Sequence, residues 1–299
     1  MSATIRRPAV AGYFYSAERE QLLEEIERCF LDQKIGPASS ILKEHPAVIS
    51  KPFTRQVEVI IVPHAGYTYS GAIAAHSYNA ISQFLTNKRE ENPTVIILGP
   101  NHYGIGSGIS ISSSSKWETP LGIAEVDQEI SNQILSKSKI IDFDNLSHSR
   151  EHSIEVQIPF LQAIQPRLYI VPICLMLQDM ETIKEVSDSI TKVIRSNKIK
   201  SKTFLIVASS DLTHYEAQET AYSQDRKLLD KIGTLDLTQY YSVLERNNVT
   251  ACGYGAIGVA MSIAKSSGMT SGKILRYATS GDVTGDTESV VGYAAVRFV

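Results

Sequence analysis

Histidines stand at or just beyond the ends of several apolar runs in this 299-residue chain. His64 follows VEVIIVP, His102 follows TVIILGPN, and both Asp211 and His214 follow TFLIVASS. His152 lies in the segment REHSIEVQIPF. Neutral imidazoles bind divalent metals and exchange protons near neutral pH, and ligands of open α/β sheets bind beyond the carboxyl ends of the strands. The pattern therefore predicts a polar, metal-capable pocket assembled from distant parts of the chain.

His64 and His102 are the first candidate metal ligands. A proline and an Ala-Gly pair flank His64, and Gly-Pro-Asn precedes His102, so the chain turns sharply at each imidazole. Each side chain alone is equally consistent with a cap that hydrogen-bonds to the backbone of a turn. Together, at the ends of what we expect to be neighbouring strands, they are better explained as two nitrogen ligands of one divalent ion.

Asp211 and His214 form the candidate proton-transfer pair. If a helix or turn begins after the strand, residues three positions apart face the same side. A nearby carboxylate orients an imidazole and raises its basicity, which suits a general base at neutral pH. Asp211 could also cap the free amides of a helix, and the two roles are compatible.

The segment from His148 to Glu155 contains HSREH, which matches the HxxEH signature of the inverted zinc peptidases. That signature needs both histidines on one helical face and a third carboxylate ligand further along the chain, and Glu155 is too close. The favoured interpretation is that Glu151, His152 and Glu155 line or brace the pocket. Ser153 then caps a helix that continues into VQIPFLQAI.

Among the three cysteines, Cys252 is the one expected to have a chemical role, because it precedes the apolar run GYGAIGVAMSIA. A thiol near a helix N-terminus is expected to have a lowered pKa, so Cys252 is a candidate metal ligand or redox-active nucleophile. A buried structural cysteine is the alternative. Cys29 and Cys174 lie in apolar patterns and are assigned to the core. Three widely spaced cysteines favour a reducing cytoplasm and no disulfide framework.

The composition argues against several classes of function. The chain is 43% hydrophobic and 20% charged, with a formal net charge of −3 and no basic stripe, so a nucleic-acid partner is not expected. No apolar stretch approaches the roughly 20 residues of a membrane span, and the start of the chain lacks a cleavable signal pattern. We therefore expect a cytoplasmic protein with no nucleic-acid or membrane partner.

Alternating apolar strands and amphipathic helices must position these residues. The alternation indicates one α/β domain over residues 1–299, with a mostly parallel central sheet flanked by helices. The final segment SVVGYAAVRFV is expected to pair antiparallel, and GIGSGIS, which lacks the spacing of a dinucleotide loop, is interpreted as turns. A polar connection reaches to about residue 55. The expected strands are 57–62, 94–99, 168–175, 203–211, 274–282 and 289–299, and the expected helices lie near 16–33, 71–85, 127–138, 156–164, 180–197, 222–233, 237–246 and 252–268.

Seven motifs spread along nearly the whole chain resemble the Memo family, which is found from archaea to animals. They are AGYFYS, PHAGYTYSG, ILGPNHYG, EHSIEVQIPFL, SSDLTHY, ACGYGAIG and SVVGYAA, in this order. Memo proteins are similar to class III extradiol dioxygenases and share their α/β fold, so the resemblance implies that fold here.

The resemblance also implies roles for individual residues. His64 and His102 match the two imidazole ligands of the dioxygenase centre, His214 matches the catalytic acid/base, and Asp211 would support the site. Cys252 takes the place of the carboxylate ligand, as in Memo proteins generally. In that family the pocket is implicated in iron or copper binding and in redox chemistry. A thiolate ligand would also accept zinc.

Three functions follow as hypotheses. The first is a metal-dependent oxidoreductase in which a small oxygen-rich or aromatic substrate gives its proton to His214. The second is a non-enzymatic module for phosphotyrosine-like or other anionic peptides, which the resemblance implies through the animal member, with Tyr67, Tyr69 and Tyr103 as walls. The third is a metal-dependent hydrolase in which His214 activates water at the metal.

Overall fold

The computed structural model describes residues 4–40, 56–86, 92–196 and 202–299, and a single large sheet runs through them. Its helices agree with the expected ones to within a few residues, except that α2 and α6 each begin four residues earlier than the pattern indicated and that α9 was not expected. The expectation of a strand over 274–282 is wrong for its last three residues, because the strand ends at Thr279 and Ser280 begins α9. The helices are α1 (Arg19–Leu31), α2 (Tyr67–Thr86), α3 (Gln128–Lys137), α4 (Gln157–Ile164), α5 (Met180–Ile194), α6 (Gln218–Gly233), α7 (Leu237–Arg246), α8 (Tyr254–Ser266) and α9 (Ser280–Thr284).

The strands confirm the apolar runs that the sequence indicated and add several short ones. The polar connection expected before the first long strand falls largely on residues 41–55, outside the described residues. The strands are β1 (Ile5–Arg6), β2 (Val57–Val62), β3 (Thr94–Pro100), β4 (Ile109–Ile111), β5 (Lys116–Thr119), β6 (Gly122–Val126), β7 (Ile141–Phe143), β8 (Tyr169–Leu175), β9 (Phe204–Ser209), β10 (His214–Glu216), β11 (Gly272–Thr279) and β12 (Val290–Phe298).

Parallel strands form the middle of the sheet, in the order β8-β3-β9-β2, and β12 then pairs antiparallel with β2. The antiparallel pairing of the C-terminal segment is therefore confirmed. The expectation that β2 and β3 are neighbours is wrong, because β9 lies between them. The chain passes from β2 through α2 to β3 without pairing the two strands, and β9, which comes later in the sequence, lies between them.

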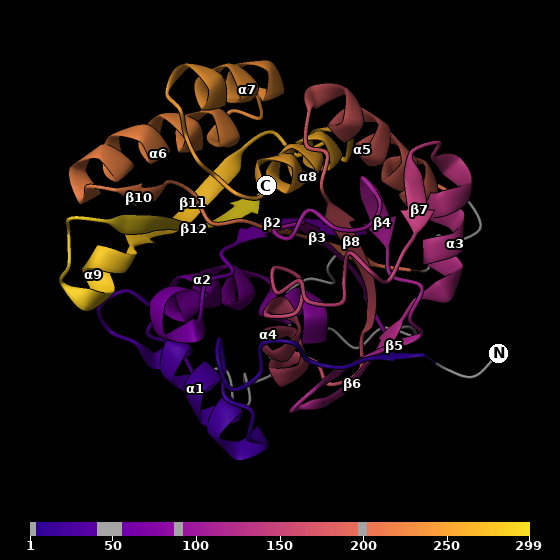
Figure 1. The fold of residues 1–299 in the computed structure, drawn as a ribbon, viewed down its shortest axis with the longest axis horizontal. Coiled ribbons are helices and arrows are strands. Elements are labelled where there is room, and N and C mark those ends of the chain that lie inside the picture. Colours follow the sequence, from indigo (N-terminus) through magenta and orange to yellow (C-terminus); the bar gives the residue numbers. More distant parts are fainter. Residues whose placement is uncertain (1–3, 41–55, 87–91, 197–201) are drawn as a thin grey trace.

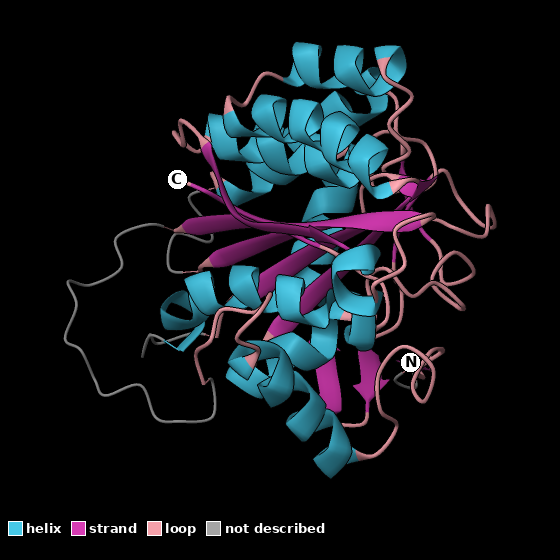
Figure 2. Ribbon diagram, turned by 90° about the vertical axis from the view of Figure 1, so that its left-hand side faces the viewer, coloured by secondary structure: helices cyan, strands magenta, loops and turns pink. Residues whose placement is uncertain are grey.

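Helices cover both faces of this sheet, as Figures 1 and 2 show. In Figure 1, α5 to α8 lie above the sheet and α1, α2 and α4 lie below it. Successive side chains of a strand point to opposite faces, and β2 is apolar on both faces except at the buried Glu58, which pairs with Arg297 of β12. Val59 and Ile61 pack in the core beneath α5 and α8, whereas Ile60 and Val62 pack in the core beneath α1 and α2. The fold is thus a single-domain α/β protein with a mostly parallel central sheet.

No helix in the described ranges has both the length and the apolar composition that a bilayer crossing needs.

A buried ion pair fastens the N-terminal segment to the irregular chain that precedes α4. The Arg6 guanidinium pairs with Glu155, donates to the carbonyl oxygens of His148 (3.1 Å) and Glu151 (2.7 Å), and lies over the Trp117 ring at 4.4 Å. Both side chains are almost fully buried. Because a buried charge is tolerated only when it is paired and hydrogen-bonded, this pair holds the two segments together.

Glu155 receives further donors from the N-terminal segment. The backbone amides of Ala9 and Val10 and the hydroxyl of Tyr15 donate to its two oxygens at 2.7–3.0 Å. Glu155 therefore ties the N-terminal segment to the chain that leads into α4, and its role in bracing the site stays a prediction.

Replacing Arg6 by leucine should lower the free energy of unfolding by about 3–5 kcal/mol, because the Glu155 carboxylate then stays buried without its counter-charge. Chemical denaturation followed by far-ultraviolet circular dichroism measures the change. Arg7→Leu is the matched control, since Arg7 is exposed and adjacent, and it should change stability by no more than about 0.5 kcal/mol. Equal effects of the two substitutions would contradict the assigned role of Arg6.

Candidate metal centre

His64, His102 and Cys252 come together at the carboxyl edge of the sheet. Their ligand atoms all lie within 4.8 Å of one another. His64 follows β2 by two residues, His102 follows β3 by two residues, and Cys252 lies two residues before α8. The imidazole centroids of His64 and His102 are 5.2 Å apart and their planes are nearly perpendicular. The two side chains therefore meet across the end of β9, although their strands are not adjacent.

Ser209, the last residue of β9, determines which nitrogen of His64 carries the proton. Its hydroxyl donates to the Ser153 carbonyl at 2.6 Å and accepts from the Gln157 amide at 2.8 Å. Since the one hydroxyl proton is used, Ser209 can only accept from Nδ1 of His64, 2.9 Å away. Nδ1 is therefore protonated, and the lone pair of Nε2 faces Sγ of Cys252 at 3.1 Å.

Glu151 performs the same task for His102. Its fully buried carboxylate lies 2.9 Å from Nδ1 of His102 and also accepts the backbone amide of His102 at 2.7 Å. The amides of His152 and Ser153 donate to the same carboxylate. Burial raises the pKa of Glu151, but the hydrogen bonds and the neighbouring imidazoles outweigh it and lower the pKa to about 2. The ionised carboxylate thus holds the proton on Nδ1 of His102 and leaves Nε2 with a free lone pair. Acceptors behind the ligands of metal sites orient imidazoles in the same way.

The Cys252 thiol differs from the expectation. Burial of the sulfur, and then the charge of Asp211, raise its pKa far above the usual range, so the prediction of a lowered thiol pKa is wrong for the metal-free protein. The helix dipole is too small to reverse this, because Cys252 precedes the first residue of α8 and is only partly exposed. Burial also holds the pKa of His64 well below its usual range. The pair is therefore a neutral thiol that donates to a neutral imidazole.

Asp211 contacts the backbone around His64 and not the ring of His214. Its Oδ1 accepts the amide of His64 at 2.7 Å, and the amide of Ala65 also contributes. Burial raises the pKa of Asp211 to about 6. The expectations that Asp211 orients His214 or caps a helix are wrong, because His214 begins strand β10 and no helix starts at Asp211. Asp211 instead fixes the turn that presents His64.

His214 keeps the free nitrogen that an acid/base requires. Its Nδ1 lies 2.6 Å from the carbonyl of Leu212 and 3.0 Å from that of Thr250, and both are acceptors. Nδ1 therefore carries the proton in the neutral ring, and Nε2 is the basic nitrogen. The Thr250 hydroxyl accepts the backbone amide of His214 at 2.7 Å. Thr250 thereby joins His214 to the segment that carries Cys252.

His152 lies against the cluster, as expected of a pocket residue. Its ring stacks on His102 with centroids 4.5 Å apart and meets the edge of His64 at 5.5 Å. His148 points elsewhere, since it is buried against Trp117 and Ser110. The zinc-peptidase arrangement is therefore wrong, because the two histidines do not share a helical face.

Two further expectations for this region need correction. Tyr67 is buried in the core, where it packs on Phe160 and donates to the Val156 carbonyl, so it is not a wall of the pocket. Ser153 does not cap α4, because the N-cap of that helix is Val156. The Ser153 hydroxyl donates instead to the Pro100 carbonyl. Tyr69 and Tyr103, in contrast, are 45% and 49% exposed.

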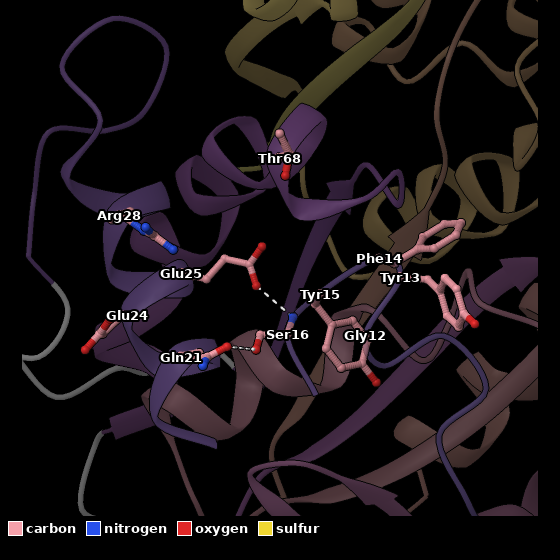
Figure 3. Close-up of a pocket in the computed structure, with 10 residues that line it drawn as sticks. All are labelled: Gly12, Tyr13, Phe14, Tyr15, Ser16, Gln21, Glu24, Glu25, Arg28 and Thr68. Carbon is pink, nitrogen blue, oxygen red and sulfur yellow. Dashed lines mark hydrogen bonds between the residues drawn. The ribbon is translucent and has the colours of Figure 1, made fainter. Parts of the chain in front are cut away.

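A hollow of about 450 Å³ lies beside the centre but does not contain it. Figure 3 shows that it is bounded by the N-terminal loop, by α1 and by the first turn of α2 at Thr68. Glu25 reaches back to the amide of Ser16 there. Phe14, which lines the hollow, also packs on the His152 ring at 4.7 Å between centroids. No residue predicted from the sequence for the centre lines this hollow.

Sequence reasoning missed the residues that orient the imidazoles from behind. Ser209 stands at the end of an apolar run, directly before the SDLTH segment, and that position is its only signal. Gln157 shows no local pattern: its amide joins Pro63 to Ser209 only after the chain has folded. The donor set itself fits a metal, because ligand atoms of His64, His102 and Cys252 lie within 4.8 Å of one another and each imidazole has an acceptor at Nδ1.

The structure is a single-domain α/β protein whose fold is consistent with the extradiol dioxygenase-like fold, and the cluster is a possible metal-binding group. The family model described as Memo-like protein matches residues 6–297. A MEMO1 family protein of Nitrosopumilus maritimus is 44% identical over 297 residues, which cover 99% of this chain and 100% of the relative. One of Sulfolobus acidocaldarius is 46% identical over 296 residues, covering 98% and 99%. The chain belongs to the Memo family.

The raised thiol pKa has a measurable consequence. Only the thiolate is nucleophilic, so iodoacetamide should alkylate Cys252 of the metal-free protein at least about tenfold more slowly than free cysteine at neutral pH. The rate should keep rising with pH, without a plateau near neutrality. Peptide-resolved mass spectrometry separates Cys252 from Cys29 and Cys174, which serve as buried internal references. A plateau near neutral pH would show that the thiol is acidic after all.

Proposed function

We propose that this chain is a metal-dependent oxidoreductase whose metal is held by His64, His102 and Cys252. The observation that carries the proposal is the orientation of the ligand atoms. Independent acceptors occupy Nδ1 of both imidazoles, which leaves both Nε2 lone pairs available, and ligand atoms of the two histidines and of Cys252 lie within 4.8 Å of one another. In the metal-free protein the His64 lone pair accepts the Cys252 thiol; a metal that displaces the thiol proton would use this lone pair together with that of His102.

Iron or copper is the proposed metal, with zinc as the non-redox alternative. Two imidazoles and a thiolate form a softer ligand set than two imidazoles and a carboxylate, which favours Cu(I), Zn(II) or thiolate-bound iron. When bound, a redox-active metal supplies Lewis acidity and electron transfer to a chelating substrate. The protein contributes the ligand geometry and the proton that Cys252 must release on binding.

His214 is the proposed acid/base. Its Nε2 is the unprotonated nitrogen of the neutral ring, since both Leu212 and Thr250 hold the proton on Nδ1. A substrate hydroxyl could therefore give its proton to this nitrogen without any change of tautomer. The proposed substrate is a small oxygen-rich or aromatic molecule. The exposed rings of Tyr69 and Tyr103, close in sequence to the two imidazole ligands, support an aromatic one.

A second candidate function rests on the same exposed tyrosines. A phosphotyrosine-like or other anionic peptide could use Tyr69 and Tyr103 as contact surface, while imidazole N–H groups donate to its anionic group. The oriented Nε2 lone pairs favour the first proposal, because they are acceptors towards the centre and would repel an anion. A hydrolase would use the same ligands but would not depend on dioxygen.

Metal titration under anaerobic conditions tests the ligand set. The wild-type protein should bind one equivalent of Fe(II) or Cu(I), measured by elemental analysis after gel filtration. His64→Ala, His102→Ala and Cys252→Ala should each weaken binding by at least about tenfold. Affinity should rise with pH, because each metal displaces the thiol proton.

The control for this titration is His76→Ala. His76 lies in α2 and its Nε2 is 3.0 Å from the Ile35 carbonyl, outside the cluster. It should bind metal like the wild-type protein. Failure to take up stoichiometric metal, or wild-type behaviour of His64→Ala, would remove the basis of the proposal.

Oxygen uptake with a panel of catechols tests the reaction. His214→Gln should retain the metal while its turnover falls by about 10²–10⁴-fold, since the general base is lost. Turnover of esters or phosphates that persists without dioxygen would favour the hydrolase. Saturable binding of phosphotyrosine in calorimetry, with no turnover of any probe, would favour the binding module.

A further inference from the structure

A buried carboxylate on α6 that the proposed mechanism does not use lies directly behind the segment that carries His214. Asp225 is fully buried. Its Oδ1 accepts both the backbone amide of Thr213 at 3.1 Å and the Thr213 hydroxyl at 2.6 Å. Its Oδ2 accepts the hydroxyl of Tyr277, on β11, at 2.7 Å. A helix and a strand thus direct one carboxylate at the residue immediately before His214.

Strand β12 leaves room for this carboxylate at Gly292. A Cβ atom built on Gly292 would lie only 2.0 Å from Oδ2 of Asp225, so a larger residue cannot stand there without displacing the carboxylate. The backbone of Gly292 also pairs with the same segment. It donates to the Thr213 carbonyl and accepts the Leu212 amide, both at 2.8 Å. Thr213 is therefore fixed from both the helix side and the strand side.

The chain is strained immediately after Thr213, the residue that Asp225 holds. Tyr215 has φ +59°, a left-handed conformation that is costly for an aromatic residue, and the register with β12 shifts between His214 and Glu216. Such strain persists only when the surrounding bonds over-determine it. Those bonds are the Asp225–Thr213 pair on one side and the His214 amide to Thr250 on the other.

We propose that Asp225 is a positioning residue that fixes the imidazole of His214 through Thr213. This inference rests on the proposed acid/base role of His214. By holding Thr213, Asp225 sets the direction of the preceding Leu212 carbonyl, which accepts Nδ1–H of His214 at 2.6 Å. Beside the Thr250 carbonyl, the second acceptor of Nδ1 at 3.0 Å, the tautomer with a basic Nε2 therefore depends on a carboxylate that touches neither the metal ligands nor the substrate space.

Removal of the Asp225 carboxylate should allow His214 to populate its second neutral tautomer. Without Asp225, the Thr213 amide lacks its acceptor in the interior, the Thr213 hydroxyl keeps only Gln224 Oε1 at 3.3 Å, and the strained segment relaxes to recover hydrogen bonds. The Leu212 carbonyl then turns away from Nδ1, and the two neutral tautomers of His214 approach each other in energy. The ligands His64 and His102, which Ser209 and Glu151 orient separately, should keep theirs.

Histidine-selective ¹⁵N NMR of the metal-free protein tests the proposal, at a pH above the titration of the imidazoles. The His214 resonances are assigned by their loss in His214→Gln. The wild-type protein should show a single His214 tautomer with the proton on Nδ1. Asp225→Ala and Thr213→Val should show both tautomers or exchange broadening at His214 alone, and Thr213→Ser should restore the single form.

Tyr277→Phe is the matched control, because it removes one hydrogen bond to the same carboxylate without touching Thr213. It should keep the wild-type His214 spectrum. Thr213→Val keeps the amide bond to Asp225, so its effect should be smaller than that of Asp225→Ala. If Asp225→Ala does not fold, Gly292→Ala replaces it, because its Cβ would displace the Asp225 carboxylate. An unchanged His214 tautomer in folded Asp225→Ala or Gly292→Ala, or an equal disturbance in Tyr277→Phe, would overturn the proposal. Because no metal is added, failure of the metal titration would overturn the proposed function and leave this inference standing.

Discussion

The buried pair of Arg6 and Glu155 is the interaction on which the rest of the site depends. The chain from His148 to Val156 contains neither helix nor strand, so no regular backbone ladder determines its course. Arg6 donates to two carbonyls of this stretch, and Glu155 accepts two backbone amides of the N-terminal segment. An unpaired charge at this depth would cost several kcal/mol, so the two segments can only be buried together. The position of Glu151, and through it that of His102, follows from this requirement.

The centre is built from neutral groups whose protons are all assigned by neighbours. Ser209 and Glu151, one a hydroxyl and the other a carboxylate, both act as acceptors and leave the same nitrogen of each imidazole free. The Cys252 thiol completes the arrangement by donating to His64. In this state the three candidate ligands carry no charge, the buried carboxylates of Glu151 and Asp211 are satisfied by hydrogen bonds, and a metal ion would replace a single proton. Neutral ligands can be buried at low cost, because burial opposes charge. The proposed ligand set would lose the thiol proton only when it binds a metal.

The sheet determines which parts of the chain can meet. Because β9 lies between β2 and β3, its end supplies Ser209 to the space between the two imidazoles, and Asp211 follows it to hold the turn at His64. Helix α8 lies over the same strands and brings Cys252 to the edge. This strand order brings together residues that are widely separated along the chain.

The sequence by itself determined the elements of the fold and the identity of the residues at the centre. Apolar runs of strand length, followed by turn residues, placed His64 and His102 at strand ends, because that pattern depends only on local backbone geometry and burial. Only the tertiary structure decided what orients them. Asp211 stands three residues from His214 yet bonds to His64, and Gln157 reaches Ser209 from another element. The thiol pKa likewise follows from burial and from the charge of Asp211, which are properties of the folded interior and not of the neighbouring residues in the chain.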